Sequence, residues 1–371
     1  MSLVELIHER RKKIENEEKS DDSDVVESSS DGHAEDSDDE IRMYRKGGYF
    51  EAKENQMLKE NKHVSWKIIN KLGRGHFSTV WRVQNVNKTD ENRDEYAMKI
   101  QKSAKHYRTS AREEIFIHEM LKKESGEGKT NICMMHSSFF HNGPNGKHFC
   151  MVFPIVDCDL CTFMESFDKE MISLDLTSKI SHEILKGVAF LHHNSIIHAD
   201  LKPENILVKK NEEIEFSICD LGTACIEGDR EFSYIQTSHY RSPEIFMHHR
   251  KWDCKIDIWS VACIIFECIT GDYLFSGEQD EDYITNFIET IGIPPRSFVD
   301  ECKEKRKFFN RDHKYIYAHD LKPMSIDRIL QERYEFDRKT SMAINHLLQP
   351  MLIWDINSRW SAKDLLRLYE T

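Results

Sequence analysis

One short run in the middle of the chain carries the residue types that phosphoryl transfer requires. It extends from Asp200 to Ile206 and reads Asp-Leu-Lys-Pro-Glu-Asn-Ile, and an Asp-Leu-Gly turn begins later, at Asp220. In such a group a carboxylate accepts or orients the proton of the attacking hydroxyl, a lysine contacts the γ-phosphate, and an amide and a second carboxylate hold Mg²⁺. The residue types and their order therefore predict Asp200 as the base, Lys202 as the phosphate contact, and Asn205 and Asp220 as the metal ligands.

A glycine-containing segment far upstream predicts where phosphates are held. Residues Leu72 to Val80 read Leu-Gly-Arg-Gly-His-Phe-Ser-Thr-Val and lie between two apolar, β-branched runs. This pattern predicts a β-hairpin whose glycines, Gly73 and Gly75, let backbone amides approach the phosphates. A glycine pair alone would indicate only a tight turn, so the assignment depends on its order relative to the other elements.

A strand and a helix follow the glycine segment and supply an ion pair. The alternating run Tyr96 to Ile100 predicts a strand that carries Lys99, within reach of the α- and β-phosphates. The stretch Ser110 to Lys122 predicts a helix with two candidate partners for this lysine, Glu113 and Glu114. We prefer Glu114, because the apolar positions of the helix lie beside it and Glu113 turns further toward solvent.

In this order the elements resemble those of a protein kinase, and the resemblance continues downstream. Tyr240-Arg-Ser-Pro-Glu244 is similar to the substrate-binding end of a kinase activation segment. The resemblance implies that Asp257, near the start of an apolar helix reaching Ile265, caps the backbone of the catalytic loop from a buried position. It also implies that Arg359 pairs with Glu244. Each residue alone has an ordinary structural explanation, whereas the ordered set does not.

More narrowly, the chain resembles the SR protein kinases, which phosphorylate serines in Arg-Ser-rich splicing factors and so regulate mRNA splicing. The matching segments cover nearly all of the chain from residue 47 onward and are Gly47–Tyr49, Leu72–Trp81, Lys102–Tyr107, Cys150–Phe153, Asp220–Cys225, Ile235–Thr237 and Thr270–Phe275. The resemblance implies a serine/threonine kinase that uses ATP and Mg²⁺, with Phe153 guarding the back of the nucleotide pocket and the backbone of Val156 near the adenine ring. The ATP contacts predicted in this way are Leu72, Gly73, Gly75, Val80, Ala97, Lys99, Glu114, Phe153 and Val156.

The same resemblance implies an acidic docking groove that holds a basic part of the substrate at a distance from the modified serine. The groove positions match Asp272, Asp282, Glu289 and Arg333, and Arg241 is expected to contact substrate at the active site. Asp282 and Glu289 are seven residues apart on an apolar-periodic segment, so they project from one helix face, where guanidinium groups can pair with them. A solvated charged helix is the alternative.

Three differences distinguish the chain from related kinases. Ala199 stands where phosphorylation-activated kinases carry an arginine that holds a phosphate, and SR protein kinases likewise have a small residue there, which implies an activation segment that needs no phosphate. Only Lys209 to Glu215 separates the strand ending at Val208 from the next strand, so the long spacer of animal and fungal family members is missing. The Glu-His-Leu-Ala-Met-Met-Glu-Arg signature of the LAMMER kinases is missing too, with residues 277–282 reading Gly-Glu-Gln-Asp-Glu-Asp at the corresponding region.

Composition and periodicity predict an α+β chain with the two-lobed protein kinase fold, in three parts. Residues 1–42 form an acidic tail, which we expect to be disordered because thirteen acidic residues and one lysine lie between Glu15 and Glu40. The tail is a solvated extension, a target for an acid-directed kinase, or a mask for a basic surface on a partner. Residues 43–155 form a strand-rich N-lobe with one helix, and residues 156–371 form a larger C-lobe with helical periodicity. We expect the nucleotide between the two lobes.

The remaining features of the sequence concern the cellular compartment, the state of the cysteines and the binding partners. The chain has 371 residues, no run of eighteen apolar residues and no apolar signal region, so we expect a soluble intracellular protein in the cytoplasm, the nucleus or both. The ten cysteines are scattered, and Cys158-x-x-Cys161 has no second pair at metal-site spacing, so we expect reduced thiols and no zinc. We also expect a monomer whose partners are Arg-Ser-rich substrates, with no direct binding to nucleic acid or membrane.

Two other functions remain open. One is a LAMMER-like kinase of the CMGC group that acts on other basic substrates. The other is a pseudokinase scaffold that binds partners without phosphoryl transfer, although the residues that pseudokinases usually lose are present as Lys99, Asp200, Asn205 and Asp220.

Overall fold

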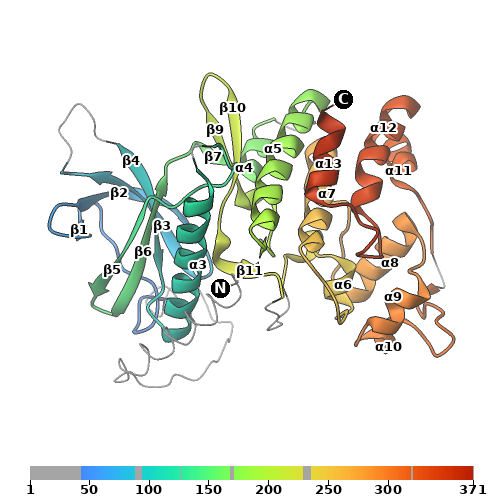
Figure 1. Cartoon of the computed structure of the whole chain (residues 1–371), viewed down its shortest axis with the longest axis horizontal. Helices are drawn as coiled ribbons and strands as arrows, with labels where there is room; N and C mark the ends of the chain where they lie inside the picture. Colours follow the sequence, from blue (N-terminus) through green and yellow to red (C-terminus); the bar gives the residue numbers. More distant parts are fainter. Residues whose placement is uncertain are drawn as a thin grey trace. The chain divides into compact units, whose positions relative to one another are not determined.

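A computed structural model of the chain describes residues 43–87, 94–126, 128–167, 171–228, 235–318 and 321–370 (Figure 1). The acidic tail, with the disorder predicted for it, lies outside the described residues. The chain divides into two compact units. The N-terminal unit comprises Met1–Gly126 and Cys133–Ile155, and the C-terminal unit comprises Glu127–Ile132 and Val156–Thr371.

The N-terminal unit contains an antiparallel sheet with one long helix beside it (Figure 1). The order of the six strands is β1-β2-β3-β4-β6-β5. The predicted strand and helix are present as β4 and α3, and both are longer than the periodicity indicated. The bounds are β1 Met57–Lys59, β2 Ser65–Arg74, β3 Ser78–Asn85, β4 Glu95–Gln101, α3 Lys105–Glu124, β5 Ser137–Gly143 and β6 Gly146–Pro154.

The two faces of this sheet are covered by different parts of the unit. On one face Trp66, Met98 and Ile100 pack with Phe50, which precedes β1. On the other face Met151 packs with residues of α3. Side chains alternate between the faces along a strand. Polar side chains of β4 that lie between the buried ones therefore point to the α3 face.

The glycine-containing segment forms the predicted hairpin. β2 pairs with β3 in antiparallel register, with Gly73 opposite Val80 and Arg74 opposite Thr79. The amide of Gly75 donates to the carbonyl of Ser78 at 2.9 Å, which closes the turn between the strands.

The C-terminal unit is mainly helical around one buried helix, α7, Lys255–Thr270. Every residue of α7 after Lys255 is buried. Helix α5, Leu174–His193, packs against it and turns an apolar stripe inward, from Ile180 to Leu191. The other helices are α4 Leu160–Glu165, α6 Pro243–Phe246, α8 Asp280–Ile291, α9 Arg296–Glu301, α10 Lys305–Phe308, α11 Ile326–Tyr334, α12 Arg338–Leu348 and α13 Ala362–Leu366, with 3-10 turns η2 Pro203–Asn205, η3 Leu221–Thr223, η4 Ser238–Tyr240, η6 Gln349–Met351 and η7 Arg367–Tyr369.

Short strands carry the chain into and out of the catalytic run. They are β7 Cys158–Asp159, β8 Ile196–Ile197, β9 Ile206–Lys210, β10 Ile214–Ile218 and β11 Cys225–Ile226. β8 pairs with β11, which ties the residues before the run to those after the Asp-Leu-Gly turn. β9 and β10 form a hairpin whose connection is shorter than the predicted segment from Lys209 to Glu215. These two residues pair across the strands, where their opposite charges favour the ladder.

The described residues contain no helix long and apolar enough to cross a membrane. The ten cysteines are free thiols. Burial raises the pKa of the Cys161 thiol to about 11, and desolvation raises that of Cys158 as well. A thiolate, the form that binds zinc, is therefore disfavoured at both positions.

Candidate active site

The carboxylate of Asp200 is held from two sides. Its Oδ1 accepts hydrogen bonds from the backbone amide of Thr237 at 3.0 Å and from the Thr237 hydroxyl at 2.7 Å. Its Oδ2 lies 3.1 Å from Nζ of Lys202, and this ammonium also donates to the Thr237 hydroxyl at 3.1 Å. The structure therefore brings the predicted base and phosphate contact together, and adds Thr237 as a bridge to which sequence reasoning assigned no role.

The two predicted metal ligands stand on either side of this group. The side-chain amide of Asn205 donates to the backbone carbonyl of Asp200 at 2.8 Å, which turns its nitrogen toward the loop. The backbone carbonyl of Asn205 accepts from the amide of Cys219 at 2.9 Å, next to Asp220. Asp220 itself has a left-handed backbone with φ of 59°. An amide oxygen and a carboxylate are hard oxygen donors, so this pair fits Mg²⁺.

His198 links the catalytic run to the metal-binding turn from a fully buried position. Its Nδ1 accepts from the backbone amide of Asp200 at 3.2 Å, and its Nε2 donates to the carbonyl of Cys219 at 2.9 Å. An amide N–H can only donate and a carbonyl can only accept, so the ring is neutral with its proton on Nε2. The histidine therefore sets the spacing between the base and the second metal ligand.

Asp257 caps the catalytic loop as the resemblance implied. Its Oδ2 accepts from the backbone amide of His198 at 2.8 Å and its Oδ1 from that of Ala199 at 3.0 Å. Nε2 of His192 lies 2.9 Å from the same Oδ2. Ala199 has φ of 64°, a left-handed conformation that costs a non-glycine residue about 1–3 kcal/mol. Hydrogen bonds to a buried carboxylate are worth about 1.5–3 kcal/mol each, which offsets that strain.

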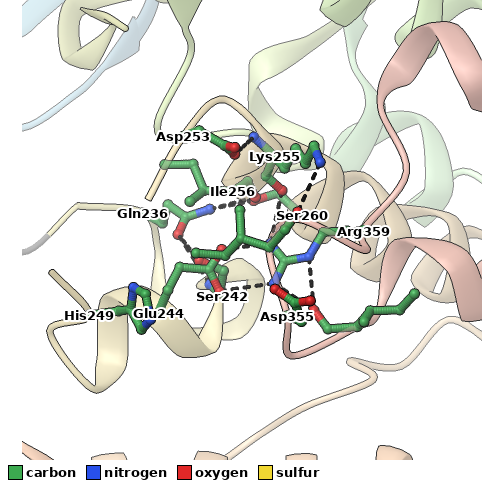
Figure 2. Close-up of polar contacts among 12 residues, drawn as sticks. Gln236, Ser242, Glu244, His249, Asp253, Lys255, Ile256, Ser260, Asp355 and Arg359 are labelled. Carbon is green, nitrogen blue, oxygen red and sulfur yellow. Dashed lines mark hydrogen bonds and ion pairs between the residues drawn. The ribbon is translucent and has the colours of Figure 1, made fainter. Parts of the chain in front are cut away.

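The last part of the activation segment docks on this loop through Gln236. Its backbone amide donates to the carbonyl of Ala199 at 2.9 Å. Its side chain donates to Ile256 and Ser260 of α7 and accepts from the amide and hydroxyl of Ser242 (Figure 2). One buried glutamine thus connects the catalytic loop, the end of the segment and α7.

Glu244 and Arg359 form the predicted ion pair, and both side chains are fully buried (Figure 2). The pair is bidentate, with distances of 2.6 Å from Nη1 to Oε1 and 2.9 Å from Nη2 to Oε2. The guanidinium also donates to the carbonyls of Lys255 and Ile353. These bonds compensate the buried charge of Arg359.

Arg241 is placed differently from the sequence prediction. It is 5% exposed, and its guanidinium donates to the carbonyls of Ile235 at 2.9 Å and Gln236 at 2.7 Å. The guanidinium of Arg241 therefore stabilises the backbone conformation of the activation segment. The prediction that Arg241 contacts substrate receives no support from this position, because burial and the two carbonyls fix the side chain.

A buried acid near the catalytic run was missed by sequence reasoning. Glu267 of α7 accepts a hydrogen bond from the hydroxyl of Tyr240 at 2.6 Å. Burial and, to a smaller extent, the nearby charge of Glu204 raise the pKa of Glu267 to about 7. Glu204 is exposed and follows Asp200 by four residues. A cation placed beside these two carboxylates would favour the ionised form of both.

In the N-terminal unit Lys99 pairs with Glu114, the partner preferred over Glu113. Its Nζ lies 2.7 Å from Oε1 and 3.0 Å from Oε2, and the glutamate side chain is fully buried. The strand register places Val80 directly opposite Lys99 and Ala97 directly opposite Phe153. Residues paired directly across strands share a face, so these predicted nucleotide contacts lie together on the α3 face of the sheet.

The two hairpin glycines are not required by the fold. A Cβ atom built on Gly73 would meet nothing within 4 Å, and one built on Gly75 would meet only the carbonyl of Ser78, at 3.9 Å. Neither residue has a positive φ. The open space beside this hairpin is therefore available to a ligand, and the neighbouring Leu72 is 44% exposed. Val156, the last predicted contact, is half-buried at the start of its segment of the C-terminal unit.

Two of the predicted docking carboxylates also have structural roles. Asp282 lies in the first turn of α8, and its Oδ2 accepts from the amides of Glu278 at 2.9 Å and Gln279 at 3.0 Å in a capping box. Oε1 of Glu289 accepts from the amide of Lys322 at 2.6 Å. An ionised carboxylate has about four acceptor positions, so both keep capacity for a second partner.

The other two predicted docking residues lie on different elements. Asp272 is exposed just after α7, and its Oδ2 accepts from the hydroxyl of Tyr334 at 2.9 Å. Arg333 is exposed next to that tyrosine on α11. The hydrogen bond from Tyr334 therefore brings these two docking positions into one neighbourhood.

Comparison with known proteins gives one family. Residues 66–368 match the family model of the protein kinase domain. The chain is 32% identical to the serine/threonine-protein kinase SRPK of Physarum polycephalum, in an alignment that covers 89% of this chain and 91% of that protein. It is 35% identical to dual specificity tyrosine-phosphorylation-regulated kinase 3 of Mus musculus, over 71% of this chain and 44% of that protein. It is 30% identical to dual specificity tyrosine-phosphorylation-regulated kinase 4 of Homo sapiens, over 67% of this chain and 46% of that protein. The chain thus spans most of the first relative and less than half of the other two.

Proposed function

The chain belongs to the protein kinase family, as a serine/threonine kinase of the CMGC type, and from this we propose that it transfers the γ-phosphate of ATP to serines in Arg-Ser-rich proteins such as splicing factors. The observation that carries the proposal is the group around Asp200, in which Thr237 and Lys202 hold the carboxylate beside Asn205 and Asp220. The α+β fold with a sheet-containing unit and a helical unit is that of this family.

The residues of the catalytic run divide the reaction between them. Asp200 accepts or orients the proton of the substrate hydroxyl, and Lys202 contacts the γ-phosphate. Asn205 and Asp220 would hold Mg²⁺, which neutralises phosphate charge when it is bound. Thr237 keeps Asp200 and Lys202 at a fixed separation, so that the base is positioned before substrate arrives.

The nucleotide contacts come from the N-terminal unit. Lys99, held by Glu114, contacts the α- and β-phosphates, and the β2–β3 hairpin contacts them through its backbone amides. This assignment is supported by Gly73 and Gly75. Neither packing nor backbone conformation requires glycine at these positions, whereas close approach of phosphates would. Ala97 and Phe153 share the face of Lys99 and are assigned to the adenine side.

Specificity for arginine-rich substrates is supported by carboxylates in two places. Glu204 is exposed within the catalytic run, where it can pair with a guanidinium. Asp272, Asp282 and Glu289 form the proposed docking set. The similarity to a kinase named SRPK over 89% of the chain is the further support for this substrate class.

Phosphorylation of an arrayed peptide library tests the proposal. We expect phosphate incorporation into Arg-Ser peptides in preference to peptides with Ser-Pro or acidic contexts. Equal use of other basic peptides would favour a kinase of the same group with broader substrates. No incorporation into any peptide, with nucleotide binding retained, would favour the pseudokinase scaffold and contradict the proposal.

Neutralising the docking carboxylates is expected to weaken binding of long substrates only. In Asp282→Asn with Glu289→Gln, each side chain keeps an acceptor oxygen for its backbone amide partner and loses its charge. Partly exposed ion pairs are worth roughly 0.2–1 kcal/mol each, so several lost contacts should raise the KM for a long Arg-Ser protein by up to about tenfold, and less at high salt.

The matched measurement for the docking variant is the KM for a short Arg-Ser peptide, which should stay nearly unchanged. Charge reversal to lysine is a poorer test, because Asp282→Lys removes the cap of α8. Equal losses on the short and long substrates would indicate a folding defect or a misplaced groove. No loss on either substrate at low ionic strength would contradict the docking assignment.

Activity is expected to survive phosphatase treatment of the purified enzyme. The reason is that Gln236 and Thr237 already bind Ala199 and Asp200 directly, without a phosphate. Rates of peptide phosphorylation before and after treatment are the measurement. Two relatives carry the name tyrosine-phosphorylation-regulated, so the sharpest control is Tyr234→Phe, the tyrosine that precedes Tyr240 in the segment. A large loss of activity in either experiment would contradict the prediction.

A further inference from the structure

The hydroxyl of Tyr49 contacts the tip of the β2–β3 hairpin from a segment that precedes the sheet. It lies 2.7 Å from the carbonyl oxygen of Gly75 and 3.0 Å from that of His76. A phenol has one proton to donate, so the two carbonyls share it. Both belong to the turn that the proposed function assigns to the ATP phosphates.

Tyr49 is fixed independently of the hairpin. It is 6% exposed, and the next residue, Phe50, is buried in the sheet core. The backbone before it is tied down by hydrogen bonds from the amide of Ser103 to the carbonyl of Gly48 at 3.1 Å and from the amide of Ala104 to the carbonyl of Gly47 at 2.9 Å. A Cβ on Gly48 would lie 2.2 Å from a backbone carbonyl, so the close approach requires glycine.

Two features surround the Tyr49 ring, a cation that contacts its face and the protein that buries the phenol. Nζ of Lys102 lies 4.5 Å from the ring centroid, a distance at which a cation and an aromatic face attract each other. Burial raises the pKa of the Tyr49 phenol above its ordinary value of 10.0. The proton that reaches the hairpin is therefore present throughout the neutral pH range.

Holding a carbonyl also holds the amide on the other side of the same peptide bond. The peptide unit is planar and trans, so the C=O of Gly75 and the N–H of His76 point in opposite directions as one rigid group. The C=O of His76 and the N–H of Phe77 form the next such group. Fixing the two carbonyls from the Tyr49 side therefore turns two amide donors away from the tyrosine.

We propose that Tyr49 is a positioning residue for the phosphates of ATP, which acts by fixing the peptide units of Gly75 and His76 so that the amides of His76 and Phe77 stay aimed at the ligand. The proposal rests on the assignment of the β2–β3 hairpin to the nucleotide phosphates, and extends it to a residue outside the hairpin. Its contribution is to phosphate binding and not to adenosine binding.

The test is Tyr49→Phe in the full chain, which keeps the buried ring and removes only the hydroxyl. Dissociation constants for MgATP and for adenosine are measured by calorimetry, together with kcat and the KM for ATP. Loss of one hydrogen bond should weaken MgATP binding and raise this KM by roughly two- to tenfold, with adenosine affinity unchanged. Amide exchange of residues 73–78 should become faster in the same variant.

The control is Tyr44→Phe, which removes a hydroxyl from a neighbouring ring, 6.5 Å from that of Tyr49. It should match the parent in both affinities. Unchanged MgATP affinity in Tyr49→Phe would overturn the proposal, and so would an equal loss of MgATP and adenosine affinity, which would indicate a general structural role. A parent enzyme that bound MgATP no better than adenosine would instead refute the phosphate assignment of the hairpin, and the proposal with it.

Discussion

Replacing Asp200 with alanine is expected to lower the rate of phosphoryl transfer by about 10²–10⁴-fold, the usual effect of removing a general base. MgATP affinity should stay nearly unchanged, because the proposed role of Asp200 concerns the substrate hydroxyl and not the phosphates. Single-turnover phosphorylation of an Arg-Ser peptide measures the rate, and calorimetric titration with MgATP measures the affinity. A single-turnover rate within about threefold of the parent would contradict the assignment.

Two matched variants separate the possible causes of that loss. Asp220→Ala removes a proposed Mg²⁺ ligand and should weaken MgATP binding itself. Thr237→Val keeps the carboxylate of Asp200 and removes the hydroxyl that donates to it at 2.7 Å. If Thr237→Val were as slow as Asp200→Ala, the loss would come from release of the activation segment and not from loss of the base.

Removing the guanidinium of Arg359 is expected to cause a large loss of stability in the C-terminal unit. Arg359→Ala leaves the carboxylate of Glu244 buried without its bidentate partner. Breaking a buried pair in this way costs about 3–5 kcal/mol. For a unit of this size the melting temperature should fall by about 10 °C, which differential scanning calorimetry of the full chain would detect.

The control for Arg359 is an ion pair of similar length on the surface. Nη2 of Arg328 lies 2.6 Å from Oε1 of Glu332, and these side chains are 58% and 46% exposed. Pairs of this kind contribute about 0.2–1 kcal/mol, so Arg328→Ala should lower the melting temperature only slightly. An equal fall in melting temperature in the two variants would mean that the buried ion pair contributes no more stability than the exposed one.

Much of the site could be predicted because its residues occur in short runs whose order along the chain is informative. The choice of Glu114 over Glu113 followed from the apolar face of one helix, and the structure contains that pair. The pairing of Glu244 with Arg359 could not be obtained from periodicity, since the two residues lie 115 positions apart. It depended on the resemblance to a family.

Other residues of the site gave no local signal. Thr237 acts through Asp200, which lies 37 positions before it, and a threonine in a loop has no pattern that reveals such a partner. The resemblance implied that Arg241 contacts substrate, whereas tertiary packing buries this side chain. Asp282 had only a weak signal, because Gln279 and Asp282 have the spacing of a capping box but not its usual Ser/Thr and Glu/Gln residue types. A docking role and a capping role require the same carboxylate, so the residue type alone did not distinguish them.

The long separation between Glu244 and Arg359 has a consequence for the chain while it is being made. Ribosomes add about 5–20 residues per second, so a partner 115 positions later is made about 6–23 s after Glu244. During that interval the end of the activation segment has no guanidinium to neutralise its carboxylate. A nascent chain is therefore expected to keep the carboxylate of Glu244 in water until synthesis has passed Arg359.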